Sequence, residues 1–272
     1  MSRCPQCVAG AARAVSARAA ATPLLAFVLH RYDWSESSLI VDLFTRDAGR
    51  VAVAAKGAKR PTSQMRAVLL PFQRILVSFG RTHADAPSDI RNLRSAEWAG
   101  GVPASGGEAL LSGFYANELI MKLLARDDPH PALWDAYAAT LPQLGGSGEA
   151  SALRAFELTL LAETGHLPDL AHVSATQQPV DPESGYALRA EAGLVNAGLE
   201  RNGDDAALGG ADAIALQAAL ARRDLGALRV ACAPCEAVLR RQLRRWLAYH
   251  LGGIPLRTRD VMRDLQPLMS AR

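Results

Sequence analysis

The alternation of apolar and polar positions divides the chain into a front part with a period of two and a longer part with a period near 3.6. The clearest feature of the front part is a predicted hairpin within residues 37–60. It combines an apolar run over Leu39–Phe44, turn residues from Thr45 to Gly49, and a second apolar run over Val51–Ala55. Gly49 stands where a hairpin turn can require a positive φ. The hairpin would deliver Lys56–Pro61, a glycine-containing basic loop, at its exit.

The rest of the front part predicts three more strands and one short helix. The strands are expected at Leu24–Tyr32, Phe72–Gly80 and Ile90–Trp98, with an exposed loop over 81–89. The helix is expected over Ser63–Leu70, capped by Ser63 and ended by Pro71. Five strands with a helix between the third and fourth are typical of a small OB-type Greek-key barrel. We therefore predict an α+β protein whose OB-fold domain covers residues 24–100.

The glycine-rich stretch 100–107 predicts a linker, and beyond it the pattern is helical. An all-α domain is expected over 107–272, with an irregular excursion at about 167–205 that contains a hairpin near Tyr186–Val195. A helical stripe from Leu110 to Leu124 predicts a first helix in the segment up to Arg126, and further helices are expected over residues 131–144, 151–164, 211–222, 234–251 and 258–265. Gly165 and the Gly252–Gly253 pair follow two of these helices, and Pro234 begins one.

Composition and charge narrow the class of protein. The 272 residues are 49% hydrophobic and 21% charged, and no apolar run reaches the ~18 residues of a membrane-spanning helix. Residues 1–23 carry three arginines and no acid, which argues against a secretory signal. They predict either a disordered basic tail or a start upstream of the true one. We expect a cytoplasmic protein.

The net charge of +3 conceals a strong polarity along the chain. Residues 24–105 hold 11 basic and 7 acidic side chains, residues 106–221 hold 5 and 16, and residues 222–272 hold 11 and 4. A basic front, an acidic middle and a basic end predict separate surfaces for different partners. A polyanion would contact the two basic parts.

Candidate catalytic and metal-binding chemistry is sparse. Two CxxC pairs, Cys4/Cys7 and Cys232/Cys235, have thiolate-clamp spacing, but their separation is far from that of known zinc modules. A P-loop, GxGxxG, HExxH or GxSxG motif is absent from the sequence, and the six histidines are scattered. We predict no enzyme, no catalytic residue, no metal and no cofactor; a zinc-dependent enzyme using the cysteines remains an alternative.

Basic residues are the most informative candidates. A cationic surface on a β scaffold suits a phosphate backbone, and the predicted DNA-binding residues are Arg31, Arg46, Arg50, Lys56, Lys59, Arg60, Arg66 and Arg74. Tyr32 and Trp34 lie beside Arg31 and are candidates for base stacking, although packing explains each equally well. On the strongest predicted helix, i,i+4 spacing gathers four more cations for DNA or an acidic partner: Arg240, Arg241, Arg244 and Arg245.

Taken together, the motifs resemble a known family. The run AFVLHRYDWSESSLIVDLFTRDAGRVAVAAKGAKRP, followed by LLPFQRILVSF and LRSAEW, resembles the OB barrel of the bacterial recombination-mediator RecO family. The helical part is similar through GFYANELIMKLLARDDPHPALWDAY, RAFELTLLAETGH and YHLGGIPLRTRDVMRDLQ. The resemblance covers about residues 24–266.

This resemblance implies a non-catalytic DNA repair protein that binds single- and double-stranded DNA and anneals complementary strands. Its implied partners are RecR, the acidic C-terminal tail of the single-strand-binding protein and, indirectly, RecA. By position, Lys56, Lys59 and Arg60 match the family's basic loop, and Arg31 matches a basic residue at the end of its first strand. Some members carry a four-cysteine zinc module after the position of Gly165, where this sequence has no cysteine.

One alternative from a different class is a protein-interaction adaptor that binds no DNA. In that interpretation the barrel is a scaffold, and the Arg240–Arg245 helix holds an acidic peptide.

Overall fold

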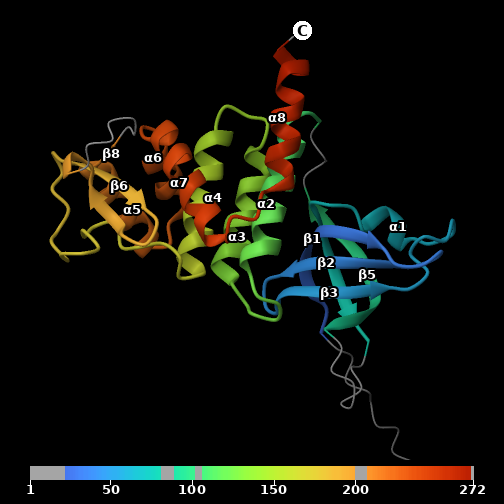
Figure 1. The fold of residues 1–272 in the computed structure, drawn as a ribbon. Helices are drawn as coiled ribbons and strands as arrows, with labels where there is room; N and C mark the ends of the chain where they lie inside the picture. The colour runs from blue at the N-terminus through green and yellow to red at the C-terminus, as the bar shows by residue number, and fades with distance from the viewer. Residues whose placement is uncertain (1–21, 81–88, 102–105, 200–206, 271–272) are drawn as a thin grey trace, which may run out of the picture.

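The computed structural model describes residues 22–80, 89–101, 106–199 and 207–270. Within these ranges a five-stranded closed barrel is followed by a helical body, as the sequence predicts (Figure 1). The predicted loop at 81–89 and the predicted tail at 1–23 lie almost entirely outside the described residues.

The barrel has the strand order β1-β2-β3-β5-β4, and β1 pairs with β4 to close it. The β3–β5 pair is parallel and the other pairs are antiparallel. The strands are β1 (Leu24–Asp33), β2 (Leu39–Thr45), β3 (Gly49–Ala55), β4 (Gln73–Phe79) and β5 (Ile90–Gly101). This is the arrangement of an OB-type barrel.

The short helix between β3 and β4 differs from the prediction. Helix α1 spans only Met65–Val68, and its N-cap is Gln64, with no side-chain cap. Ser63 instead donates its backbone N–H to the carbonyl of Arg60, at 3.0 Å. The expected Ser63 cap and the eight-residue helix are therefore wrong, because Ser63 belongs to the turn that leaves the basic loop.

The strands next to the helical body are apolar on both faces. In β1, Ala26 and Val28 point into the barrel core, whereas Phe27 and Leu29 pack into the core of the helical body. Phe44 and Phe72 also pack into the core of the helical body, together with Phe27 and Leu29. Because both faces of these strands are buried, their sequences are continuous apolar runs and do not alternate between apolar and polar residues.

The helical body begins at α2 and ends with α8, which projects from the molecule (Figure 1). Its helices are α2 (Glu108–Leu123), α3 (Pro131–Thr140), α4 (Glu149–Glu163), α5 (Gly210–Ala221), α6 (Leu225–Cys232), α7 (Glu236–His250) and α8 (Arg257–Ser270). Short 3-10 turns lie at Leu141–Gln143 and Ala197–Leu199. None of the helices in the described ranges is long and apolar enough to cross a membrane.

The irregular excursion contains a small sheet with the strand order β7-β6-β8. Its hairpin, β6 (Gly185–Arg189) and β7 (Gly193–Asn196), lies where the sequence predicts one, and β8 (Leu208–Gly209) adds a third strand. Helix α6 was not predicted from the sequence. The residue that could have indicated it is its N-cap Asp224, whose carboxylate accepts a hydrogen bond from the N–H of Ala227.

Several predicted boundaries shift by a few residues, and α3, for example, ends at Thr140 rather than at residue 144. Pro234 precedes the N-cap Cys235 of α7 rather than occupying the first helical position. Strand β5 extends to Gly101, so the predicted linker begins inside a strand. Helix α8 continues to Ser270, beyond the predicted end at Leu265.

Candidate nucleic-acid interface

The basic loop after β3 is built from two consecutive turns. Ala58 donates its N–H to the carbonyl of Ala55, and Arg60 donates its N–H to the carbonyl of Gly57, at 3.1 Å. Gly57 has a φ of +73°, which favours glycine, and the Arg60 side chain lies over it. Ala58 is fully buried in the barrel core, so the loop is anchored while Lys56 and Arg60 are exposed.

Lys59 joins this loop to the β1–β2 loop. Its backbone N–H donates to the carbonyl of Ser37 at 3.0 Å, and its Nζ donates to the carbonyl of Ser35 at 2.9 Å. The Nζ also lies 3.2 Å from Oδ1 of Asp33. Lys59 therefore holds two loops together, and we call these loops, residues 34–38 and 56–60, the barrel tip.

Four of the predicted DNA-binding residues are exposed and have no ion pair or hydrogen-bonded side-chain partner among the described residues. They lie at the end of β1, on the basic loop and on α1: Arg31, Lys56, Arg60 and Arg66. Unpaired guanidinium and ammonium groups are available to phosphates without first breaking an internal contact.

Three other predicted residues have partners inside the protein. Arg46 forms a two-pronged ion pair with Asp135 of α3, with N···O distances of 2.9 and 3.1 Å. Hydrogen bonding and charge from that carboxylate raise the pKa of Arg46. Arg74 donates its Nε–H to the carbonyl of Ala99.

Arg50 is the third and the most buried. Its side chain, 14% exposed, donates to the carbonyls of Met121 and Leu124 at the end of α2, and its Nε lies 3.5 Å from Asp42. Arg46 and Arg50 thus fasten the barrel to the helical body, a role that the sequence pattern did not distinguish from phosphate binding.

Sequence reasoning missed one exposed cation on the barrel, Arg94. It lies on β5 next to the buried Leu93, and it has no partner in the described ranges. Since successive strand residues face opposite sides, the predicted strand 90–98 already contained the signal that Arg94 points outward.

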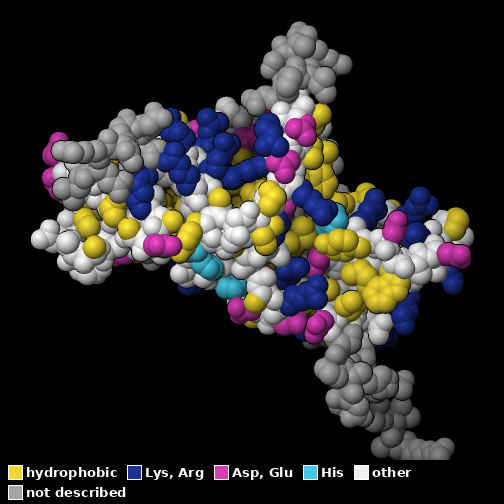
Figure 2. Space-filling view, in the orientation of Figure 1, with side chains coloured by type: hydrophobic (Ala, Val, Ile, Leu, Met, Phe, Trp, Pro, Cys, Tyr) yellow, Lys and Arg dark blue, Asp and Glu magenta, His cyan; other side chains and the backbone are white. Residues whose placement is uncertain are grey.

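The second basic surface lies on α7, as predicted. Arg240, Arg241, Arg244 and Arg245 are all exposed, while Leu239, Leu243, Trp246 and Leu247 on the other side are buried. Figure 2 shows Lys and Arg side chains gathered over the part of the helical body that α7 and the start of α8 occupy. The barrel tip and α7 are separate surfaces on different parts of the molecule.

Cys232 and Cys235 lie where α6 meets α7, and both are buried. Burial raises the pKa of the Cys235 thiol to about 11, and burial also raises the pKa of Cys232. In the described ranges, no three His, Cys, Asp or Glu side chains are grouped as metal ligands. Cys4 and Cys7 lie outside those ranges.

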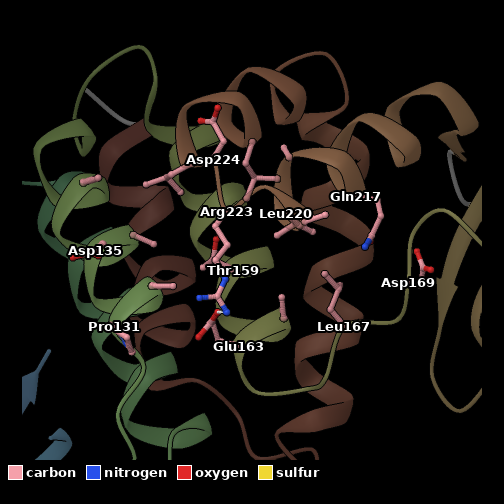
Figure 3. A pocket seen from close by; sticks show the side chains of 18 of the residues that line it. Pro131, Asp135, Thr159, Glu163, Leu167, Asp169, Gln217, Leu220, Arg223 and Asp224 are labelled. Atoms are coloured by element: carbon pink, nitrogen blue, oxygen red, sulfur yellow. Dashed lines mark ion pairs between the residues drawn. The ribbon is translucent and has the colours of Figure 1, made fainter. Parts of the chain in front are cut away.

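A cavity of about 950 Å³ lies in the helical body, between α3, α4 and the α5–α6 region (Figure 3). Its polar side chains serve the fold: Arg223 pairs with Glu163 at 3.6 Å, Asp224 caps α6, and Gln217 accepts from the N–H of Leu170. These groups are engaged with each other or with backbone rather than converging on a common point.

Comparison with known proteins identifies two family models that together cover most of the chain. The model described as recombination protein O N terminal matches residues 24–100, and the model described as recombination protein O C terminal matches residues 104–260. The first match covers the barrel, and the second begins just before α2.

Curated relatives are similar over nearly their whole length. The DNA repair protein RecO of Polaromonas naphthalenivorans is 52% identical over 247 residues, and that of Delftia acidovorans is 50% identical over 249 residues. The corresponding protein of Variovorax paradoxus is 49% identical over 255 residues. Each alignment covers 89% of this chain and 96% of the relative.

Proposed function

The chain belongs to the RecO family of DNA repair proteins, and from that premise we propose that its barrel tip binds single- and double-stranded DNA largely without sequence preference. The observation that carries this proposal is the set of cations on and beside the tip that have no partner among the described residues: Arg31, Lys56, Arg60 and Arg66. Arg94 extends the same set along β5.

The geometry supports binding to the backbone rather than to base edges. The four unpaired cations lie at the end of β1, on the loop 56–60 and on a four-residue helix, and that helix is much shorter than the recognition helices that enter a major groove. Phosphate contacts of this kind fix the position of a nucleic acid without reading its sequence.

The proposed activity is annealing and mediation, with no covalent step and no cofactor. Cations that neutralise phosphates release condensed counterions, and this lowers the repulsion between two complementary strands. Working with RecR in the cytoplasm, the protein would help RecA replace the single-strand-binding protein on gapped DNA.

The α7 surface supports a second contact in the same proposal. Four exposed arginines on one helix suit a short acidic segment, and the acidic C-terminal tail of the single-strand-binding protein has that chemistry. An adaptor that uses only this helix and binds no DNA is the competing function.

The test is a titration of the full chain with labelled single-stranded DNA at several salt concentrations. We expect Lys56→Ala with Arg60→Ala to weaken binding and to reduce the slope of log affinity against log salt by about 1.4, since each lost phosphate contact on a single strand accounts for about 0.7. Arg222→Ala removes an exposed arginine that has no ion pair among the described residues from the end of α5, on the helical body, and is the control; it should leave the slope unchanged.

An unchanged salt slope in the tip variant would overturn the site assignment. A wild-type chain that binds no DNA at low salt, yet still binds an acidic peptide, would favour the adaptor.

A further inference from the structure

Trp34 differs from the other tryptophans in what its indole contacts. The indole N–H groups of the other three donate to protein oxygens at 2.7 to 3.1 Å: Trp98, Trp134 and Trp246. Trp34 is 58% exposed, and its indole N–H has no acceptor among the residues that the structure describes. More than half of this indole is therefore open to a ligand, and its N–H is unused within the described residues.

The loop that carries Trp34 is held in a fixed conformation. Trp34 and Ser35 both donate their N–H groups to the carbonyl of Ser38, at 3.2 and 3.4 Å, and Ser38 donates its own N–H to Oγ of Ser35. Lys59 adds a bond to the carbonyl of Ser35. The backbone below the indole is therefore already ordered, which lowers the entropy that a ligand contact would cost.

The same bonds bring the loop that carries Trp34 next to a loop with free cations, while the carboxylate of the neighbouring Asp33 is already paired with Lys59 at 3.2 Å. Lys59 ties the Trp34 loop to the loop that bears Lys56 and Arg60, and Arg31 lies three residues before Trp34 at the end of β1. In a single strand, phosphates flank every base. A strand whose phosphates meet these cations would bring its bases within reach of the indole.

We propose that Trp34 stacks on an unpaired nucleobase and thereby gives the barrel tip a preference for single-stranded DNA. This inference rests on the proposed DNA binding by the tip. It adds that the tip distinguishes single strands from duplexes by their unpaired bases. Cations serve single strands and duplexes alike, whereas a base inside a duplex has both faces covered by its neighbours. Stacking on an aromatic side chain therefore increases the affinity only for DNA with unpaired bases, and the increase does not depend on which base is stacked.

The experiment compares three labelled ligands of equal length on the full chain: oligo(dT), an abasic strand with the same backbone, and a duplex. We expect wild-type protein to bind oligo(dT) about 5- to 150-fold more tightly than the abasic strand, in line with the usual contribution of one stacked base. Trp34→Ala should reduce affinity for oligo(dT) to nearly that of the abasic strand. Its affinity for the abasic strand and the duplex should stay within about twofold of wild type.

Two further variants make the test specific. Trp34→Phe keeps an aromatic face and should retain most of the preference. Trp98→Ala removes an indole that is 66% exposed but bonded to Gln73 on the β4–β5 pair, and it should change none of the three affinities. A loss that is equal for all three ligands, or no loss for any, in Trp34→Ala would overturn the stacking role while leaving DNA binding by the cations intact. Failure of wild type to bind any of the three would overturn both.

Discussion

Gly49 of the barrel lies directly against Asp128 of the α2–α3 connection, so that a Cβ added to Gly49 would sit 1.9 Å from the Asp128 carbonyl oxygen. The next residue, Arg50, accepts the backbone N–H of Asp127 at 2.9 Å with its own carbonyl. The turn between β2 and β3 is therefore part of the joint between barrel and helical body, and it is not a free hairpin end.

This contact predicts that Gly49→Ala destabilises the protein by more than about 3 kcal/mol. Two effects combine, since the φ of +67° is strained for any residue with a Cβ and the new methyl group collides with backbone. Urea denaturation measures the free energy of unfolding. Gly252→Ala is the matched control, because Gly252 has a φ of +64° but no neighbour within 4 Å, so it should lose only about 1–2 kcal/mol. Equal losses in the two variants would show that the close approach to Asp128 has no energetic weight.

The contacts of Arg50 predict that its replacement lowers the stability of the protein without weakening DNA binding. Arg50→Ala leaves the buried carboxylate of Asp42 without its ion pair and two α2 carbonyls without a donor, so we expect a loss of about 3 kcal/mol in the free energy of unfolding. The DNA affinity of the folded variant should stay within about twofold of wild type.

Arg60→Ala should behave in the opposite way, with unchanged stability and weaker binding, because its side chain is exposed and has no partner in the described ranges. Denaturation and DNA titration of both variants check the pair. A strong binding defect in Arg50→Ala without loss of stability would contradict this assignment.

The same residues show how far the sequence leads. Its hydrophobic pattern predicted all five barrel strands, and the turn chemistry at Gly49 was correctly identified. The pattern also located the basic face of α7. These features depend on residues close together in the chain, so the local hydrophobic periodicity is enough to predict them.

Partners distant in the sequence were not predictable in this way. Arg46 and Arg60 are both arginines in or next to turns, and only the fold shows that Arg46 meets Asp135, 89 positions away. Trp34 and Trp134 likewise differ in exposure, because Trp134 lies on the face of α3 that packs against Phe27 of the barrel, and its indole donates to the carbonyl of Phe44. Charge and residue type therefore identify candidate residues for the site, but only the tertiary contacts show which of these residues are exposed and unpaired.

A buried ion pair in the helical body gives a third prediction. Arg154 and Glu157 on α4 are both buried, their N···O distance is 2.7 Å, and the Tyr115 hydroxyl also donates to Glu157. Arg154→Met alone should cost about 3–5 kcal/mol, because it leaves the Glu157 carboxylate buried without a countercharge. Arg154→Met combined with Glu157→Met should cost less than the Arg154 change alone. Urea denaturation of wild type, both single variants and the double variant completes the cycle. Strictly additive losses would contradict the coupling.

The pH dependence of stability should carry a contribution from Glu118, which fixes the start of α8. Its Oε1 accepts the N–H of Arg257 at 2.9 Å, and its Oε2 accepts the N–H and hydroxyl of Thr258. Burial alone would raise the pKa of Glu118, but these bonds outweigh it and hold the pKa below its usual value of 4.5. Because the folded-state pKa is the lower one, the stabilising contribution is complete above about pH 5 and disappears as the pH falls through that pKa.

Glu118→Gln removes the titrating group, so its free energy of unfolding should be lower than that of wild type at pH 7 and should fall less steeply between pH 5 and pH 3. Urea denaturation across this range measures both slopes, and hydrogen exchange at the Thr258 amide reports the docking of α8 directly. Glu97→Gln, on an exposed part of β5, is the control and should leave both the slope and the exchange rate at wild-type values. Parallel curves for wild type and Glu118→Gln would contradict the assignment, because the carboxylate would then contribute equally at every pH.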